Sequence, residues 1–301
     1  MKTFFKKSYG RNAIWRRIAH FYCERRFSKL AALHLKDSPQ LVVFSFDYIS
    51  LQIAGYGSYE RQELETFFDW IHSMSPGYLS TGVGVDVGAN IGNHALAFSR
   101  HLKHVHAFEP NPRTFKVLSL NSELASNVTC YQLGLGRGAD ILNLENIPSN
   151  IGGSRIVSHS NSHTTPVRIV ALDEAMADVS NIRLIKIDVE GHEDAVLAGA
   201  EEVIKKHQPV VIFEQLAECF KDGESASIKL LKTFGYERFA VIRRGPCAPN
   251  CWPTFARSIY TIAARVIVGE KIYIENVSTF RKQFYPLIVA LPSHLSVGVL
   301  K

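Results

Sequence analysis

The stretch Val83-Gly-Val-Asp-Val-Gly-Ala-Asn-Ile-Gly-Asn93 decides the fold of this chain. Its first five residues predict a short buried strand, and Gly88 and Gly92 predict a tight turn into a helix over residues 93–102. A second apolar run, residues 104–109, predicts a strand that ends on Glu109. Glycines let a ligand approach the backbone, and an acid after the second strand can accept hydrogen bonds from ribose hydroxyls. This β-α-β unit therefore predicts a site for an adenosine-containing cofactor.

Apolar runs and helical patterns alternate around this unit. The expected elements are a strand over 41–46, a helix over 59–71, a helix over 112–125, a strand over 128–133, an irregular hairpin or lid over 134–166, strands over 167–171 and 184–188, a helix over 193–206, a strand over 209–214, a helix over 225–234, and strands over 239–243 and 287–291. This alternation is typical of a mostly parallel, doubly wound α/β sheet. The last two strands have no clear helix between them, and an alternative is that they pair antiparallel across the connection 244–285.

The 301 residues allow one α/β core domain plus an arm. We expect a basic helical arm over residues 1–40, a strand and helix over 41–80, and a cofactor domain over 81–301, with an insert at 244–285 before the last strand. The five cysteines are odd in number and mostly scattered, which favours a reducing, cytoplasmic location. No apolar run reaches the roughly 18 residues of a membrane-spanning helix.

The net charge of +6 is concentrated in the first thirty residues, which hold nine Lys and Arg against Glu24 alone and so carry +8, leaving −2 for the remainder. A nucleic-acid enzyme is expected to spread basic residues along its cleft, so we predict no nucleic-acid partner. Aromatic residues interleave with these charges. We favour a solvated basic helix that packs its aromatics on the main domain. The alternative is a peripheral contact of residues 1–30 with an anionic membrane surface.

Four blocks of sequence occur in an order that is familiar: Gly57-Ser-Tyr-Glu60, Val85-Asp-Val-Gly-Ala-Asn-Ile-Gly92, Phe108-Glu-Pro-Asn111, and Leu184-Ile-Lys-Ile-Asp-Val-Glu-Gly-His-Glu193. In these blocks the chain resembles the FkbM family of S-adenosylmethionine-dependent methyltransferases, and the likeness covers roughly residues 47–215 well. The resemblance implies a class I methyltransferase (Rossmann-like) sheet, mostly parallel and seven-stranded, with its last strand antiparallel. It also implies methylation of a hydroxyl oxygen, often on a sugar or a polyketide-type product.

Seven residues are expected to contact S-adenosylmethionine: Asp86, Gly88, Asn90, Gly92, Glu109, Asn111 and Leu135. Glu109 should meet the ribose hydroxyls, and the two glycines give room for the methionine moiety. A lone aspartate in an apolar strand, Asp86, should contact the cofactor's amino group directly or through water, or else bind the turn amides. Asn111 can also cap the helix that follows it. The slot around Leu135 should take adenine, although the acid common there in related enzymes is absent.

Four residues at the carboxyl ends of neighbouring strands are the catalytic candidates: Asp188, Glu190, His192 and Glu214. An alcohol is a poor nucleophile near neutral pH and needs a base, or a metal that lowers its pKa. His192 has the ordinary pKa best suited to taking a proton, and the alternative is a helix-start histidine without chemistry. Carboxylates around one pocket repel unless they are protonated, paired or bridged by a cation. Because nothing in the spacing demands a metal, we predict none.

Two other functions stay open. An NAD-dependent oxidoreductase uses the same first β-α-β unit, but the turn here reads Gly-x-x-x-Gly, and no tyrosine is followed four residues later by lysine. A non-catalytic cofactor-binding homologue would not need the acids Asp188, Glu190 and Glu214. The acceptor is expected to be a small molecule or a glycan, and the sequence predicts no oligomeric state.

Overall fold

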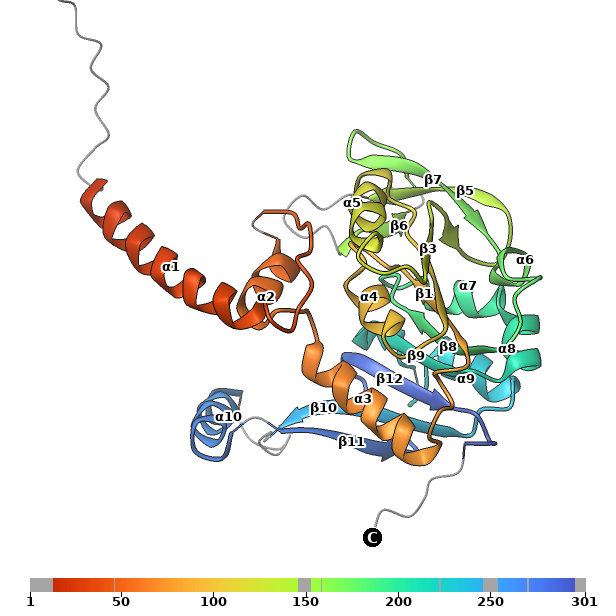
Figure 1. Cartoon of the computed structure of the whole chain (residues 1–301). Coiled ribbons are helices and arrows are strands. Elements are labelled where there is room, and N and C mark those ends of the chain that lie inside the picture. Colours follow the sequence, from red (N-terminus) through yellow and green to blue (C-terminus); the bar gives the residue numbers. More distant parts are fainter. Residues whose placement is uncertain are drawn as a thin grey trace, which may run out of the picture. The chain divides into compact units, whose positions relative to one another are not determined.

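The computed structural model describes residues 13–45, 47–145, 153–157, 159–221, 223–245, 254–269 and 271–295. The chain splits into two compact units (Figure 1). One comprises Met1–Gln40 and Phe44–Tyr59, and the other Leu41–Val43 and Glu60–Lys301. None of the described helices combines the length and the apolarity that crossing a bilayer requires.

The first unit contains two helices, α1 (Ala13–His34) and α2 (Tyr48–Tyr56). No residue of α1 is buried, and Trp15, Phe21 and Tyr22 are exposed, so its aromatic side chains are not packed within their own unit. The part of the arm before Ala13 lies outside the described residues. Helix α2 was not predicted. It begins after Asp47, whose side chain accepts a hydrogen bond from the backbone N–H of Ile49 at 3.0 Å.

The strand expected over residues 41–46 was wrong, because residues 41–45 have no strand structure and residue 46 is not described. The backbone of Val42 bonds instead to the side-chain amide of Asn121. Its N–H donates to Asn121 Oδ1 at 2.7 Å, and its carbonyl accepts from Asn121 Nδ2 at 2.9 Å. A side chain thus satisfies the groups that a neighbouring strand would have satisfied.

The second unit is built on an eight-stranded sheet of order β11-β10-β12-β9-β8-β1-β2-β3 (Figure 1). The strands are β1 (Val83–Val87), β2 (His104–Phe108), β3 (Val128–Tyr131), β8 (Ile182–Ile187), β9 (Val210–Gln215), β10 (Arg238–Gly245), β11 (Lys271–Val277) and β12 (Tyr285–Leu291). Strands β3, β2, β1, β8 and β9 are parallel, and their near-continuous apolar sequences suit burial on both faces.

The class I arrangement is confirmed, since β12 inserts antiparallel between β9 and β10. The count of seven strands was wrong. An eighth, β11, comes from the connection 244–285 and pairs antiparallel with β10. The same connection holds α10 (Thr254–Val268), and residues 246–253 within it are not described.

Helices cover both faces of the sheet. They are α3 (Arg61–Met74), α4 (Asn93–Ser99), α5 (Pro112–Ser122), α6 (Leu172–Ala175), α7 (Glu193–Ala198), α8 (Glu201–His207), η2 (Ala217–Cys219) and α9 (Ala226–Thr233). Along β9, Val211 and Phe213 join the apolar cluster of α7, α8 and α9, whereas Ile212 joins that of α3, α4 and α5. Because neighbouring residues of a strand point to opposite faces, these clusters are the two layers of the core.

Two further expectations for this unit need correction. The region 134–166 was expected to be an irregular hairpin or lid, and the hairpin is confirmed, since β5 (Asp140–Glu145) and β6 (Arg155–Val157) pair antiparallel. The region is nevertheless part of a regular second sheet, of order β4-β7-β5-β6, completed by β4 (Gly134–Leu135) and β7 (Thr164–Val170). Residues 146–152 and 158 are not described. The helix expected over 193–206 is two helices, α7 and α8. They are separated at Gly199, where a Cβ would lie 1.8 Å from the carbonyl oxygen of Gly136.

Candidate active site

The carboxyl ends of β1, β2, β8 and β9 meet at one edge of the sheet, where the sequence placed the site. The turn after β1 requires its glycines. Gly88 has φ +76°, and a Cβ there would lie 1.9 Å from the carbonyl oxygen of Asp188. Gly92 has φ +90°, and Asn90 between them is also left-handed at +50°. The turn over residues 88–92 is therefore a backbone cradle, in which a side chain at Gly88 would meet the carbonyl oxygen of Asp188.

Glu109 ends β2 beside this cradle and is buried. Its carboxylate accepts backbone N–H groups from Asn90 at 3.0 Å and from Asn111 at 2.8 Å. Burial raises the pKa of Glu109 to about 7, against the stabilising effect of the two amides. Each carboxylate oxygen can accept more than one hydrogen bond, so capacity for a ribose hydroxyl remains.

Asn111 has a structural role beside Glu109. Its side-chain oxygen accepts from the backbone N–H of Arg113 at 3.0 Å and so caps α5. The sequence predicted this cap. A direct contact of Asn111 with the cofactor stays a prediction.

Asp86 and Lys186 form a buried ion pair that the sequence analysis missed. Asp86 is fully buried, and its Oδ1 lies 3.5 Å from Lys186 Nζ. Among the described residues, neither oxygen of Asp86 accepts a hydrogen bond. Lys186 Nζ donates to Asp188 Oδ2 at 3.1 Å. Asp86 has no exposed surface, and its contact with the cofactor's amino group, directly or through water, stays a prediction.

Burial alone would lower the pKa of Lys186, but the carboxylates of Asp188 and Asp86 outweigh it and raise that pKa. Lys186 is therefore charged at any ordinary pH. The signal in the sequence was a single lysine in the apolar run 184–188.

Three of the four predicted catalytic residues come together: Asp188, Glu190 and Glu214. One carboxylate oxygen of each lies within 4.8 Å of the others. Burial and the charges of Asp188 and Glu190 raise the pKa of Glu214 to about 9, and burial together with Asp188 raises the pKa of Glu190. Glu190 also has a left-handed backbone, φ +51°, before Gly191. A shared proton or a divalent cation would relieve the repulsion, so this geometry offers metal ligands that we had not predicted.

His192 is not part of that carboxylate group, although it was the fourth candidate. It precedes α7, and its Nε2 would lie 3.2 Å from a Cβ built on Gly136, the residue after β4. Burial lowers the pKa of His192. Leu135 of β4 is buried in the core, and an adenine contact there stays a prediction.

Glu60 and His94 form a second largely buried pair, which was not among the predicted site residues. His94 Nε2 lies 3.3 Å from Glu60 Oε2, and both side chains are largely buried. Glu60 precedes α3 with a left-handed φ of +53°, and its charge contributes to the raised pKa of Lys186. The signals were the position of Glu60 in the first motif and of His94 directly after the glycine turn.

The family model of the methyltransferase FkbM domain matches residues 86–237. The hexuronic acid methyltransferase AglP of Haloferax volcanii is 35% identical over 130 residues, which are 42% of this chain and 53% of that protein. Methyltransferase 1 of Beauveria bassiana is 29% identical over 199 residues, 57% of this chain and 78% of that protein. The chain thus spans about half the length of the first of these relatives.

Among solved structures, methyltransferase FkbM of Methylobacillus flagellatus matches with a TM-score of 0.31 and 18% identity, over 62% of this chain and 47% of that one. A precorrin-6y C5,15-methyltransferase of Geobacter metallireducens matches with a TM-score of 0.41 and 13% identity, over 79% and 92%.

Proposed function

Because this chain belongs to the FkbM methyltransferase family, we propose that it transfers a methyl group to a hydroxyl oxygen of a sugar, a glycan or a related small molecule. S-adenosylmethionine is the cofactor, as the family implies, and this favours methyl transfer over the nicotinamide chemistry of the alternative. The sugar is suggested by the relative AglP, whose name gives hexuronic acid as its substrate. The proposal rests on the cluster of three carboxylates, Asp188, Glu190 and Glu214, at the edge of the sheet.

The residues present suit the cofactor. The turn at Gly88 keeps its backbone free of a side chain, which would meet the carbonyl oxygen of Asp188, and Glu109 keeps acceptor capacity for the ribose. When bound, S-adenosylmethionine supplies a methyl group that its sulfonium already activates. The chain therefore has to position the acceptor oxygen, exclude water and take up a proton.

Asp188 is our proposed proton acceptor. Its side chain is 31% exposed, so an acceptor hydroxyl can reach it, and Lys186 Nζ lies 3.1 Å from its Oδ2. As the new C–O bond forms, the hydroxyl proton passes to a carboxylate oxygen of Asp188. Glu190, whose pKa is raised by burial and by Asp188, can then take that proton, whereas Glu214, with a pKa of about 9, already carries a proton near neutral pH.

Formation of S-adenosylhomocysteine by Asp188→Asn tests this role. With a panel of sugars as acceptors, we expect turnover to fall by about 10²- to 10⁴-fold, the range for loss of a general base. Affinity for S-adenosylhomocysteine should change by less than about threefold, because the amide keeps the size of the side chain.

The matched control is Asp178→Asn, an exposed aspartate outside the carboxylate group. Unchanged turnover in Asp188→Asn would remove the role assigned to it, and absence of S-adenosylhomocysteine formation by the wild type with every acceptor would count against the proposed reaction.

A further inference from the structure

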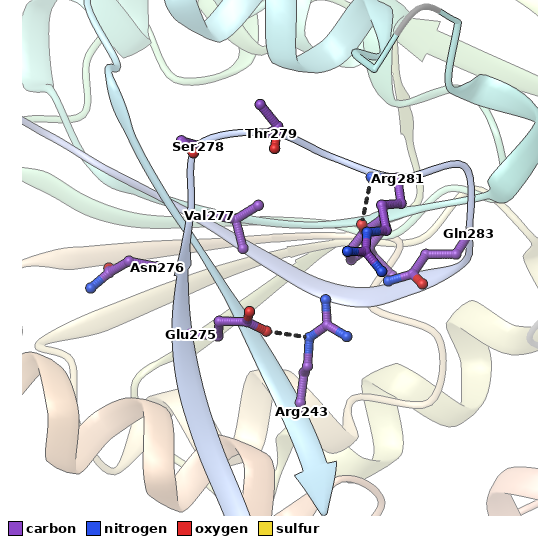
Figure 2. Close-up of a pocket in the computed structure, with 9 residues that line it drawn as sticks. Arg243, Glu275, Asn276, Val277, Ser278, Thr279, Arg281 and Gln283 are labelled. Atoms are coloured by element: carbon purple, nitrogen blue, oxygen red, sulfur yellow. Dashed lines mark hydrogen bonds and ion pairs between the residues drawn. The ribbon is translucent and has the colours of Figure 1, made fainter. Parts of the chain in front are cut away.

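A cavity of about 320 Å³ lies beside the carboxyl end of β10, between β11 and the start of β12 (Figure 2). Its lining includes Arg243, Glu275, Ser278, Thr279, Arg281 and Tyr285. We propose that this cavity binds an anionic group, a carboxylate or a phosphate, that the methyl acceptor carries. The inference rests on the proposed function, because it names a property of that acceptor.

The charges of the lining favour an anion. Arg243 Nε pairs with Glu275 Oε2 at 2.8 Å, which accounts for the carboxylate in the lining. Among the described residues, the side chain of Arg281 makes no ion pair or hydrogen bond. Figure 2 shows the guanidinium groups of Arg243 and Arg281 turned toward the same part of the cavity. Two guanidinium groups and one carboxylate leave a single positive charge, and guanidinium groups bind carboxylates and phosphates by paired hydrogen bonds.

One buried residue, Tyr285, holds both arginines in place. Its hydroxyl accepts a hydrogen bond from the backbone N–H of Arg281 at 3.0 Å. The guanidinium of Arg243 lies 5.9 Å from the centroid of its ring, which is cation–π distance. Ser278 and Thr279 contribute hydroxyl groups to the same lining. The guanidinium of Arg243 and the backbone of Arg281 are thus positioned before a ligand arrives, which lowers part of the entropic cost of binding.

The sheet topology places the cavity near the proposed methyl-transfer site. Tyr285 is the register partner of Gln215, the residue after Glu214. Strand β10 is antiparallel to β12, which is antiparallel to β9, so β10 and β9 end at the same edge. Two strand spacings are roughly 10 Å, about the span of a sugar with a charged substituent. An acceptor that places its anion in the cavity and its hydroxyl at the carboxylates has to pass over this edge, because Tyr285 lies in the layer of α7, α8 and α9, whereas Glu214 shares the face of Ile212.

Calorimetric titration of the full-length protein, saturated with S-adenosylhomocysteine, tests the inference. The probes are glucuronic acid, glucose 6-phosphate and the neutral sugar glucose, and the tighter of the two anions identifies the carboxylate or the phosphate. We expect both anions to bind more tightly than glucose. Arg281→Gln should weaken their binding about tenfold, the loss of one charge-assisted contact, and leave glucose unaffected.

The matched control is Lys282→Gln, which removes the same charge from an exposed neighbour that does not line the cavity. The inference is overturned if the anions bind no better than glucose, or if the two variants lose the same affinity. Binding of S-adenosylhomocysteine is measured first and separately. If that ligand does not bind, the proposed function fails, while the anion titrations on the free protein still decide the cavity.

Discussion

Lys186 is the residue on which the charge balance of the site depends. It is buried between two carboxylates, 3.5 Å from Asp86 and 3.1 Å from Asp188. Removing one member of a buried ion pair is costly because the remaining charge stays in a medium of low polarity. The contribution of such a pair is therefore seen in what its disruption does to the fold.

We predict that Lys186→Met lowers the free energy of unfolding by about 3–5 kcal/mol, because the buried carboxylate of Asp86 loses its counter-ion. Urea denaturation followed by circular dichroism measures this change. Lys205→Met provides the control, since Lys205 forms only an exposed i,i+4 pair with Glu201, and its loss should leave the free energy of unfolding almost unchanged. Equal losses in the two variants would contradict a special role for Lys186.

Glu193 gives a prediction for pH. It is buried, accepts the backbone N–H of Gly191 at 2.9 Å, and burial raises its pKa to about 7. A carboxyl group whose pKa is higher in the folded than in the unfolded state stabilises the fold at low pH, and this contribution is lost as pH rises through the folded pKa. Relative to Glu193→Gln, the wild type should therefore lose stability between about pH 4.5 and 7. Thermal melts of both proteins at several pH values test this, and a difference independent of pH would contradict it.

At the scale of elements, apolar runs were the reliable signal. Strands β1, β2, β8 and β9 were predicted close to their observed bounds, because a strand buried on both faces needs an unbroken apolar sequence. The break between α7 and α8 could not be predicted in this way, because the apolar pattern continues through Gly199 and the cause is the distant backbone of Gly136. Long-range contacts of this kind leave no periodic signal.

We predict that Gly199→Ala destabilises the fold by about 1–3 kcal/mol, the usual cost of overpacking, since its Cβ would meet the carbonyl oxygen of Gly136. Gly138→Ala is the comparison, because nothing lies within 4 Å of a Cβ there. It should be neutral or slightly stabilising, because alanine restricts the unfolded chain. Chemical denaturation of both variants decides, and the idea fails if Gly199→Ala is as stable as Gly138→Ala.

Helix α1 carries the membrane prediction. Arg16, Arg17, Arg25 and Arg26 are exposed on it together with Trp15 and Phe21. We expect the protein to sediment with vesicles that contain anionic lipid but not with neutral ones, and changing the four arginines to glutamine should weaken binding strongly, at about 1 kcal/mol for each charge. Binding that is the same for both vesicle types would leave the basic arm without this role.

At the scale of the whole molecule, topology explains both what the sequence predicted and what it missed. Asp188, Glu190 and Glu214 could be grouped in advance, because parallel neighbouring strands end at the same edge. Lys186 and His94 could not, since the sequence does not determine the register that makes Lys186 the partner of Asp86, nor the face of α4 that carries His94. His192 lies outside the carboxylate cluster, because closeness in sequence to Asp188 does not determine the direction of its ring. The arginine cavity lies partly in the connection 244–285, for which the family resemblance gave no guide.

The contact between Gly88 and the carbonyl of Asp188 joins the donor half of the crevice to the acceptor half. Any side chain at position 88 would displace Asp188, the residue that we propose receives the hydroxyl proton. We therefore expect a mutational screen at position 88 to yield no variant in which only the binding of the methyl donor is changed. Each variant that binds the donor more weakly should also transfer the methyl group more slowly.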